Sequence, residues 1–447
     1  MCAFAFSSAA VLVAQEPQAP TGDREGLAVR ADRVERHGIT WRFDQEYVVG
    51  TFANGDPWVL GPVRILAITP RTVEVDGRVL HGSMIDPDPS SMLQGYDSAM
   101  YDDQARERYR DDLNCAWGVD AEHPLVLAAP GSLVSAISRT ECGVTPTLQT
   151  AAVLTCVAAV PAPDAFRPPF AGHDKQIAYR EAGLDYGVLQ QLRPAEGAPA
   201  IDTVAAAFER VWLDHAPEWP VRYLHPLDNM PDYGREIAAT VGTGALLLNS
   251  DLSNERKRLL LVRMVQLGID LHGQLRAGGH WPGRGGHGHG RKLPILLAGA
   301  VLHDARMLAV GRDFVSAPRP DAPTGQFFGE DGQTFFVTAT APGVWNGGHG
   351  GYTKEHDGLP EWGFAHVDEP QHDRAGWEDN PYRRCCTANG WVGEALAARM
   401  MGLQEAWNHP AFFAYMDRYL QVVPSERWHR AWVPWHAAMW DTYRANY

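Results

Sequence analysis

One glycine-rich loop gathers cationic, imidazole and indole side chains at high density. Residues 278–292 read Gly-Gly-His-Trp-Pro-Gly-Arg-Gly-Gly-His-Gly-His-Gly-Arg-Lys. Arginine binds a carboxylate through two parallel hydrogen bonds, and an indole offers a flat face on which a sugar ring can stack. The loop is therefore a candidate wall of an anion-binding site. Its candidate contacts are His280, Trp281, Arg284, His287, His289, Arg291 and Lys292.

The same loop leaves two other interpretations open. His287 and His289 have a spacing that can ligate zinc, but at least one further ligand would have to come from elsewhere in the chain. Alternatively, the loop is solvated and binds nothing. The anion-binding interpretation needs no metal and no other cofactor, and we expect none to be required.

A second glycine-rich loop carries groups suited to acid–base chemistry. Residues 345–352 read Trp-Asn-Gly-Gly-His-Gly-Gly-Tyr and so present Trp345, Asn346, His349 and Tyr352. Acid–base work on a sugar needs a side chain that is neutral yet able to lose a proton, and tyrosine or histidine near a cation meets that need. The alternative is a structural loop with an incidental tyrosine.

Three more segments carry candidate groups. The run 228–236 ends in Tyr233 and Glu236 at the start of an apolar helix, where Asp232 is equally suited to act as the helix N-cap. Two later loops, 359–366 and 380–386, combine acids, cations and aromatic rings, and they contain Glu361, Trp362, His366 and Arg383, with the acid Asp373 between them. Glycoside hydrolysis needs two carboxylates across the scissile bond, so the acids of these loops keep that reaction open.

Composition excludes several classes of protein. The 447 residues include 39 Lys and Arg against 54 Asp and Glu, a net charge of −15. An acidic chain is a poor general binder of nucleic acid, although a local basic cluster can still attract an anion. The sequence contains no P-loop, no nucleophile elbow, no zincin helix and no dinucleotide fingerprint. It also contains no apolar run long enough to span a bilayer.

The elements that must position these groups divide into two regions. Short alternating strands with glycine and proline turns predict a β-sandwich-like domain over 28–165. Beyond it, apolar residues recur with helical spacing, which predicts an (α/α) toroid over 166–447 and an α+β, two-domain protein. The expected helices cover 201–215, 235–249, 254–275, 293–310, 390–403 and 411–422.

The N-terminal segment 1–27 has the features of a signal-peptide remnant followed by a polar leader. Residues 3–14 are apolar and small, without a preceding basic region. We therefore expect a periplasmic or secreted protein. A disulfide between Cys115 and Cys142 is possible, but the spacing of the six cysteines does not decide it.

Several strings in the chain resemble those of bacterial carbohydrate-active proteins. They are Trp41–Asp44, Gly50–Val63, Gln94–Ser98, Arg167–Phe170, Gly290–Pro294 and Pro360–Gly363. Together the set resembles polysaccharide lyases of the α/α-toroid kind, most nearly polysaccharide lyase family 38, whose members degrade alginate or glucuronan. The resemblance covers about residues 35 to 400.

This resemblance implies β-elimination from a polysaccharide that contains uronic acid. It implies Tyr352 as the acid and base, Arg291 and His287 as groups that neutralise the substrate carboxylate, and Glu236 as the residue that positions them. The residues expected to line the sugar-binding subsites are Trp281, Lys292, Trp345, Asn346, His349, Trp362, His366 and Arg383. A glycoside hydrolase on a toroid and a non-catalytic glycan-binding protein are the alternatives.

Overall fold

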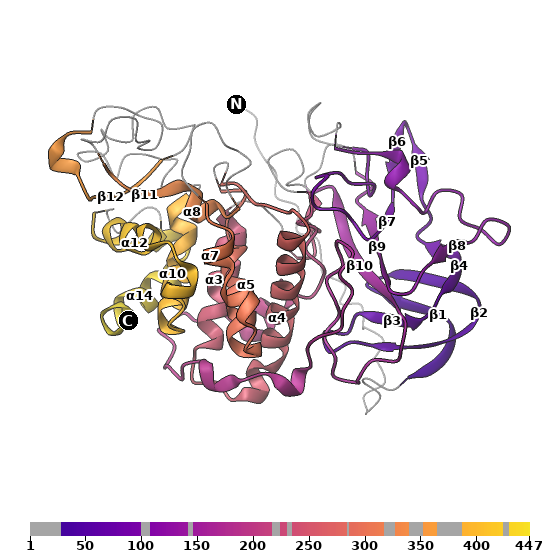
Figure 1. Ribbon diagram of the computed structural model, residues 1–447, viewed down its shortest axis with the longest axis horizontal. Helices are drawn as coiled ribbons and strands as arrows, with labels where there is room; N and C mark the ends of the chain where they lie inside the picture. Colours follow the sequence, from indigo (N-terminus) through magenta and orange to yellow (C-terminus); the bar gives the residue numbers. More distant parts are fainter. Residues whose placement is uncertain are drawn as a thin grey trace, which may run out of the picture.

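The structure is a computed structural model of the chain. It describes residues 28–99, 108–141, 146–216, 224–229, 235–283, 286–316, 327–338, 352–363, 387–422 and 429–447. In Figure 1 the strands of the first third form one half of the molecule and the helices form the other. This confirms the predicted order of a β-rich region followed by a helical one.

The β-rich half contains one mixed sheet that curls nearly into a barrel (Figure 1). Its strands are β1 (Val29–Arg36), β2 (Ile39–Thr51), β3 (Pro57–Leu60), β4 (Val63–Thr69), β7 (Ser83–Ile85), β8 (Leu125–Leu127), β9 (Gly131–Ser138) and β10 (Leu148–Val157). The order is β7-β9-β10-β3-β2-β4-β8, with β1 paired to β2. All pairs are antiparallel except β10 with β3. A small ribbon of β5 (Val73–Val75) and β6 (Arg78–Leu80) stands beside it.

The long strand β2 explains why a single sheet replaces the two facing sheets of a sandwich. Its 13 residues pair with β1, β3 and β4 along different stretches. A register shift between Arg42 and Phe43 lets the strand bend, as β-bulges do. Alternate residues Ile39, Trp41 and Phe43 point into one buried cluster that strands from both ends of the sheet share.

The helical half is built from short and medium helices. They are α2 (Ile201–Ala206), α3 (Arg235–Leu248), α4 (Asn254–Arg276), α5 (Lys292–Leu302), α6 (Ala305–Leu308), α7 (Val310–Asp313), α8 (Gly329–Gln333), α10 (Ala388–Met400), α11 (Gln404–Trp407), α12 (Pro410–Val422), α13 (His429–Trp432) and α14 (Pro434–Tyr443). A two-stranded ribbon of β11 (Thr334–Phe336) and β12 (Pro360–Trp362) lies with α8 at the upper end of this half in Figure 1. Single 3₁₀ turns complete it at Glu181–Gly183, Tyr186–Val188, Lys354–His356 and Arg444–Asn446, and another lies at Asp111–Leu113 in the β-rich half.

Two expected helices are shorter than predicted. The segment 201–215 is helical only to Ala206. The segment 293–310 breaks at His303, whose φ of 55° is left-handed, and Asp304 then caps the next helix through the amides of Arg306 and Met307. Apolar periodicity continues through both breaks because the turns also face the core, so period alone does not reveal them.

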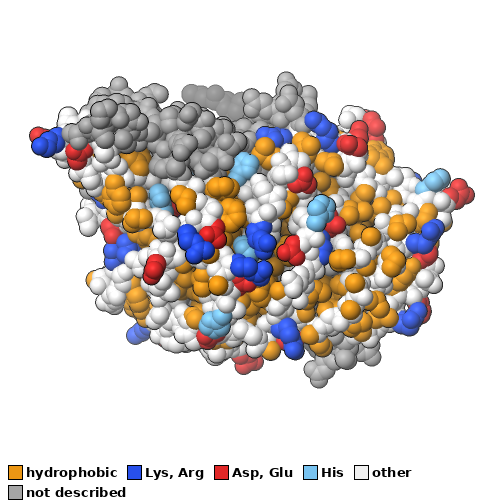
Figure 2. Space-filling view, viewed as in Figure 1, with side chains coloured by type: hydrophobic (Ala, Val, Ile, Leu, Met, Phe, Trp, Pro, Cys, Tyr) orange, Lys and Arg blue, Asp and Glu red, His pale blue; other side chains and the backbone are white. Residues whose placement is uncertain are grey.

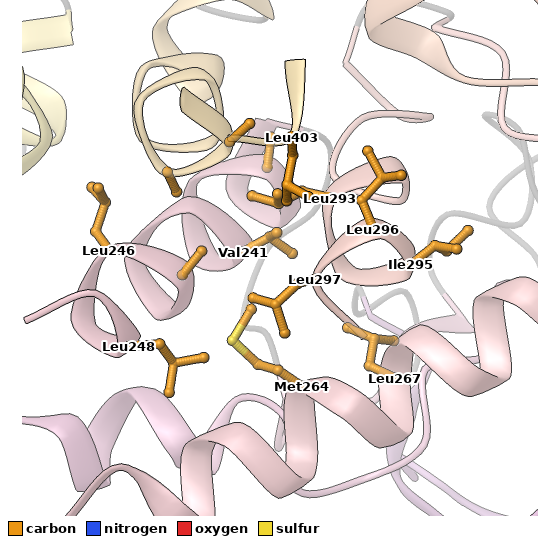
Figure 3. Close-up of a cluster of buried hydrophobic side chains, with 14 of the residues drawn as sticks. Val241, Leu246, Leu248, Met264, Leu267, Leu293, Ile295, Leu296, Leu297 and Leu403 are labelled. Atoms are coloured by element: carbon orange, nitrogen blue, oxygen red, sulfur yellow. The ribbon is translucent and has the colours of Figure 1, made fainter. Parts of the chain in front are cut away.

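Helices α3, α4 and α5 share one apolar core. Figure 3 shows Val241 and Leu248 of α3, Met264 of α4 and Leu297 of α5 converging on the same space, and all four are buried. Helix α3 packs most closely against α10 at Gly242, where an added Cβ would lie 2.8 Å from the backbone nitrogen of Glu394. Any larger residue there would force the two helices apart.

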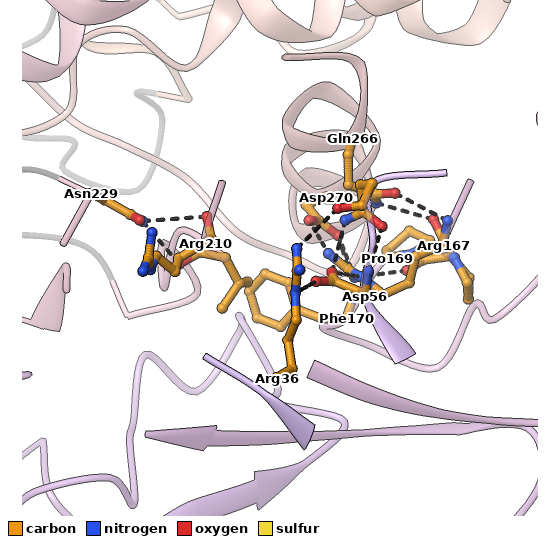
Figure 4. A network of polar contacts seen from close by, with 12 residues as sticks. Arg36, Asp56, Arg167, Pro169, Phe170, Arg210, Asn229, Gln266 and Asp270 are labelled. Carbon is orange, nitrogen blue, oxygen red and sulfur yellow. Dashed lines mark hydrogen bonds and ion pairs between the residues drawn. The ribbon is translucent and has the colours of Figure 1, made fainter. Parts of the chain in front are cut away.

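A buried ion network joins the two halves (Figure 4). The Arg167 guanidinium donates through Nε to Asp56 at 2.8 Å, and through Nη1 and Nη2 to Asp270 of α4 at 2.9 and 2.6 Å. Burial alone would raise the pKa of Asp56, but the charges of Arg167 and Arg36 outweigh it and lower that pKa. The side chain of Gln266 accepts from the Arg167 amide at 3.0 Å.

The surface is charged in both signs. Figure 2 shows acidic and basic side chains interspersed over the face seen there. Cys115 and Cys156 are free thiols, whereas Cys142 lies outside the described residues. Within the part of the chain that the structure describes, no helix combines the length and the hydropathy that a membrane span requires.

Replacing Arg167 tests whether the junction holds the halves together. Arg167→Met leaves Asp56 and Asp270 buried without their shared partner, and we expect it to lower the free energy of unfolding by about 3–5 kcal/mol. Denaturant unfolding measures this. The control is Arg180→Ala at the exposed pair with Asp164, where we expect about 0–1 kcal/mol. Equal stability of the two variants would contradict the role of Arg167.

Candidate active site

Arg291 lies at the N-terminus of α5 and faces the protein interior. It is 0% exposed, and Nη2 and Nε donate to Asp214 at 2.6 and 3.2 Å. Its Nη1 donates to the carbonyl oxygens of His287 at 3.1 Å and His289 at 2.5 Å. The guanidinium therefore fixes the backbone of the glycine-rich loop in this structure, and it does not present a free charge to solvent.

Asp214 is the acceptor at the centre of this network. Besides Arg291, it contacts Nε2 of His225 at 2.9 Å, and its backbone oxygen accepts from the Trp281 indole at 3.0 Å. Burial would raise the pKa of Asp214, but Arg291 and then His225 hold it well below the ordinary value. Trp281 is thus buried and anchors the loop through its indole N–H. It does not present its ring to solvent, as stacking on a sugar would require.

Like Arg291, Lys292 is buried and paired with groups of the protein interior. Its ammonium group pairs with Asp331 of α8 and donates to the backbone oxygen of Trp407 at 2.6 Å. The Trp407 indole in turn donates to Asp331 at 2.8 Å. Burial lowers the pKa of Lys292, and Asp331 opposes that effect. Lys292 therefore connects α5, α8 and α11, and it lines no surface in this structure.

His289 is a buried neutral imidazole. Burial lowers its pKa to about 3. Its Nε2 lies 2.7 Å from the side-chain oxygen of Gln333, so we assign the proton to Nε2, which leaves Nδ1 as an acceptor. Nδ1 has no hydrogen-bond partner among the described residues, and the ring meets Trp391 edge-on at a centroid distance of 4.8 Å.

Two glutamates lie beneath the loop, and sequence reasoning identified neither. Glu330 of α8 accepts from the amide of Gly290 at 2.5 Å, and burial raises its pKa to about 7. Glu394 of α10 is 0% exposed, and neither of its carboxyl oxygens has a hydrogen-bond partner in the described structure. Burial first, and then the charge of Glu330, raise the pKa of Glu394 well above its ordinary value. Burial therefore favours the protonated form of Glu394.

The sequence could have pointed to Glu394 but not to Glu330. Glu394 lies in the middle of a helix that is buried on every side, and an acid at such a position is an exception that a sequence can reveal. Glu330 lies in the short stretch Gly-Glu-Asp-Gly-Gln, which reads as a polar turn. Only the packing of α8 under the loop brings Glu330 to Glu394.

The remaining described candidates occupy the edges of this network. Glu236, at the first turn of α3, lies 3.3 Å from the guanidinium of Arg235. His287 is half-buried in the loop. Tyr352 is half-buried with its ring edge-on to Phe335 at 6.5 Å, and Phe335 lies on β11.

Trp362 is fully buried on β12. The structure thus brings Trp281 and Arg291 together at Asp214, with His287 against Arg291, and it pairs the adjacent Lys292 with Asp331 of α8. It brings Glu236 to the margin of the cluster, because the next residue, Ile237, packs on Gly290.

Other predicted residues cannot be placed in this way. Trp345, Asn346, His349, His366 and Arg383 lie outside the described residues, as do Arg284, Tyr233 and Asp373. Their assignment stays a prediction. In the described ranges, no group of three or more His, Cys, Asp or Glu side chains is arranged to hold a metal ion. His289 points its Nε2 at Gln333, so a zinc site shared with His287 has no support here.

Comparison with protein-family models, with curated proteins and with solved structures finds no match to the chain. The resemblance to polysaccharide lyases therefore rests on the quoted strings alone.

The raised pKa of Glu394 gives a pH test. The folded protein keeps a proton that the unfolded chain loses above the ordinary pKa of 4.5. The free energy of unfolding therefore falls as pH rises above that value, by up to about 1.4 kcal/mol per pH unit for one proton. Glu394→Gln removes this cost, so its stability relative to the unsubstituted protein should grow as pH rises above 4.5.

Denaturant unfolding at several pH values measures this difference. Glu74→Gln on the exposed strand β5 is the control, and its difference from the unsubstituted protein should stay flat with pH. A flat difference for Glu394→Gln as well would show that Glu394 is not held protonated.

Proposed function

We propose that this protein is a polysaccharide lyase that cleaves a uronic-acid-containing polymer, such as alginate or glucuronan, by β-elimination. The observation that carries the proposal is the Glu330–Glu394 pair. Burial and the neighbouring Glu330 favour the protonated form of Glu394, and a protonated carboxyl is a hydrogen-bond donor that can bind an anion. A uronate carboxylate is an anion of the right chemistry.

The reaction makes a specific demand on that donor. A base removes the proton at C5, the bond between C4 and the leaving oxygen breaks, and a C4–C5 double bond forms. Negative charge accumulates on the adjacent carboxylate as the proton leaves, so a neutral donor that binds it stabilises the transition state. Glu394 supplies such a donor without the cost of burying another charge.

The roles of the other residues follow from their positions. Tyr352 would take the C5 proton and return one to the leaving oxygen, as the resemblance implies, and its half-buried ring beside β11 supports that role. His287 and Glu236 would contact the sugar from the margin of the cluster. Arg291 would position His287 and His289 through their carbonyl oxygens. Because Glu394 is buried, substrate has to displace its present neighbours to reach it.

Two finer points belong to the same proposal. The helical half would be an (α/α) toroid of the lyase type, which the close packing of α3 with α10 and of α4 with α5 supports. The protein would act outside the cytoplasm on an acidic polysaccharide and without a cofactor. The apolar segment at 3–14 supports the export of the protein.

The carboxyl pair also favours a second candidate, a glycoside hydrolase. An acid with a raised pKa next to a second carboxyl is the arrangement that protonates a leaving group in glycosidases. A lyase and a glycoside hydrolase would use Glu394 differently. A lyase needs a neutral donor there, whereas a hydrolase needs a proton that can be transferred.

Substitution of Glu394 separates these reactions. Incubation with alginate or glucuronan should raise the ultraviolet absorbance of the unsaturated product. Glu394→Ala should lower that rate about 100-fold, whereas Glu394→Gln keeps a neutral donor and should stay within about tenfold of the unsubstituted enzyme. Reducing ends without absorbance, together with equal loss in both variants, would identify a hydrolase. Binding without any turnover would identify a glycan-binding protein.

Tyr352→Phe tests the proposed acid and base. Loss of the hydroxyl removes the group that moves the proton, so turnover should fall at least 100-fold while the unfolding midpoint stays the same. Tyr47→Phe, which loses an exposed hydroxyl bonded to Asp44, is the control and should keep full activity. Near-normal turnover of Tyr352→Phe would remove Tyr352 from the mechanism.

A further inference from the structure

A separate cavity of about 320 Å³ lies beside the Arg167 junction. Asp88 from the β-rich half, the segment 169–179, helix α4 and helix α6 all contribute to its wall. Its lining residues all belong to the described part of the chain, and none belongs to the candidate active site. Cavities of this size between two structural units are common places for small ligands.

Arg276 provides an uncommitted positive charge at this cavity. It lies in the last turn of α4, it is exposed, and it makes no hydrogen bond or ion pair with the described residues. The other two arginines of the wall are occupied. Arg306 pairs with Asp304 at 3.0 Å and donates to the Tyr179 hydroxyl at 3.1 Å, and Arg167 is bound by Asp56 and Asp270. Arg276 is thus the group that can take a carboxylate.

His272 stands one helical turn before Arg276 and so lies on the same face of α4. It is only 6% exposed, yet its ring has no hydrogen-bond partner in the described structure. Burial lowers its pKa to about 4, so the imidazole is neutral at pH 7 and offers one N–H donor and one acceptor nitrogen. A neutral donor and acceptor side by side match a hydroxyl group better than an ion.

The rest of the wall combines an apolar floor with a polar rim. Ile269, Pro169 and Met307 supply apolar surface, and the exposed side chains of Asp174 and Gln176 stand at the edge. The ring of a sugar has the same two faces, because its C–H groups are apolar and its hydroxyls are polar. The wall therefore suits a hydroxylated ring that carries one carboxylate.

We propose that this cavity is a binding site for a sugar acid, with Arg276 holding the carboxylate and His272 a hydroxyl group. The choice of uronic acids as the ligand class rests on the proposed function, but binding at this cavity does not depend on Glu394 or Tyr352. A lyase that releases uronic acid units would have a product or a distal substrate unit available for such a site.

Calorimetric titration of the full chain with glucuronate, and with glucose as the matched sugar that lacks the carboxylate, tests the site. Glucuronate should bind at least about tenfold more tightly than glucose, since a charge-assisted hydrogen bond is lost in the neutral sugar. Arg276→Ala should weaken glucuronate binding by about tenfold or more and leave glucose unchanged. Arg256→Ala, an exposed arginine at the other end of α4, is the control.

The outcomes separate this proposal from the enzymatic one. Glucuronate that binds Arg276→Ala as tightly as the unsubstituted protein, or that does not bind at all, would overturn the site. His272→Gln, which keeps a neutral donor and acceptor, should retain more binding than His272→Leu, and equal binding of those two would remove His272 from the site. Glu394→Ala should keep the part of glucuronate binding that depends on Arg276, because Glu394 does not line this cavity. Arg276-dependent binding by a protein that shows no turnover would support the site and contradict the lyase.

Discussion

The ion network around Arg167 is the constraint on which the arrangement of the two halves depends. Asp56 belongs to the turn before β3 and Asp270 to α4, so one buried guanidinium fixes the sheet against the longest helix. Two carboxylates on one arginine would leave an excess of negative charge, and Arg36 at 3.5 Å from Asp56 restores the balance. A buried charge set of this kind adds little net stability, but it tolerates only one geometry. Arg167 also lines the neighbouring cavity, so the arrangement of this ion network helps to define the cavity wall.

The same physics holds the glycine-rich loop in place. Glycines bring no side chains that could pack, so a loop rich in them needs other anchors. Arg291 binds two loop carbonyls and is itself fixed by Asp214, while Glu330 accepts from Gly290. Arg291, which the sequence suggests as a ligand contact, is thus a buried side chain that anchors the loop. Consequently, the most reactive groups of the site are the acids and the imidazole beneath the loop.

Electrostatics in this region follow from burial rather than from net charge. The chain carries −15 overall, yet the pKa values of Glu330 and Glu394 are raised first by their loss of water and then by neighbouring carboxylates, Asp331 for Glu330 and Glu330 for Glu394. Burial and the charge of Glu330 outweigh the opposing charge of Arg291 and raise the pKa of Glu394, whereas Arg291 and His225 outweigh burial and lower the pKa of Asp214. The pKa values of two acids near one loop are therefore shifted in opposite directions, which favours a hydrogen-bond donor at Glu394 and an anion at Asp214.

The sequence by itself determined the order of a β-rich region and a helical region, because alternation and helical spacing are local patterns. It also determined that chemistry-bearing residues concentrate in the loop at 278–292, since residue type is visible without structure. Only the tertiary structure decided that Arg291 and Lys292 point inward, that the sheet curls instead of splitting, and that Glu330 meets Glu394. These depend on partners far away in the chain, such as Asp214 for Arg291 and Asp331 for Lys292, and no local pattern records which distant group will neutralise a charge.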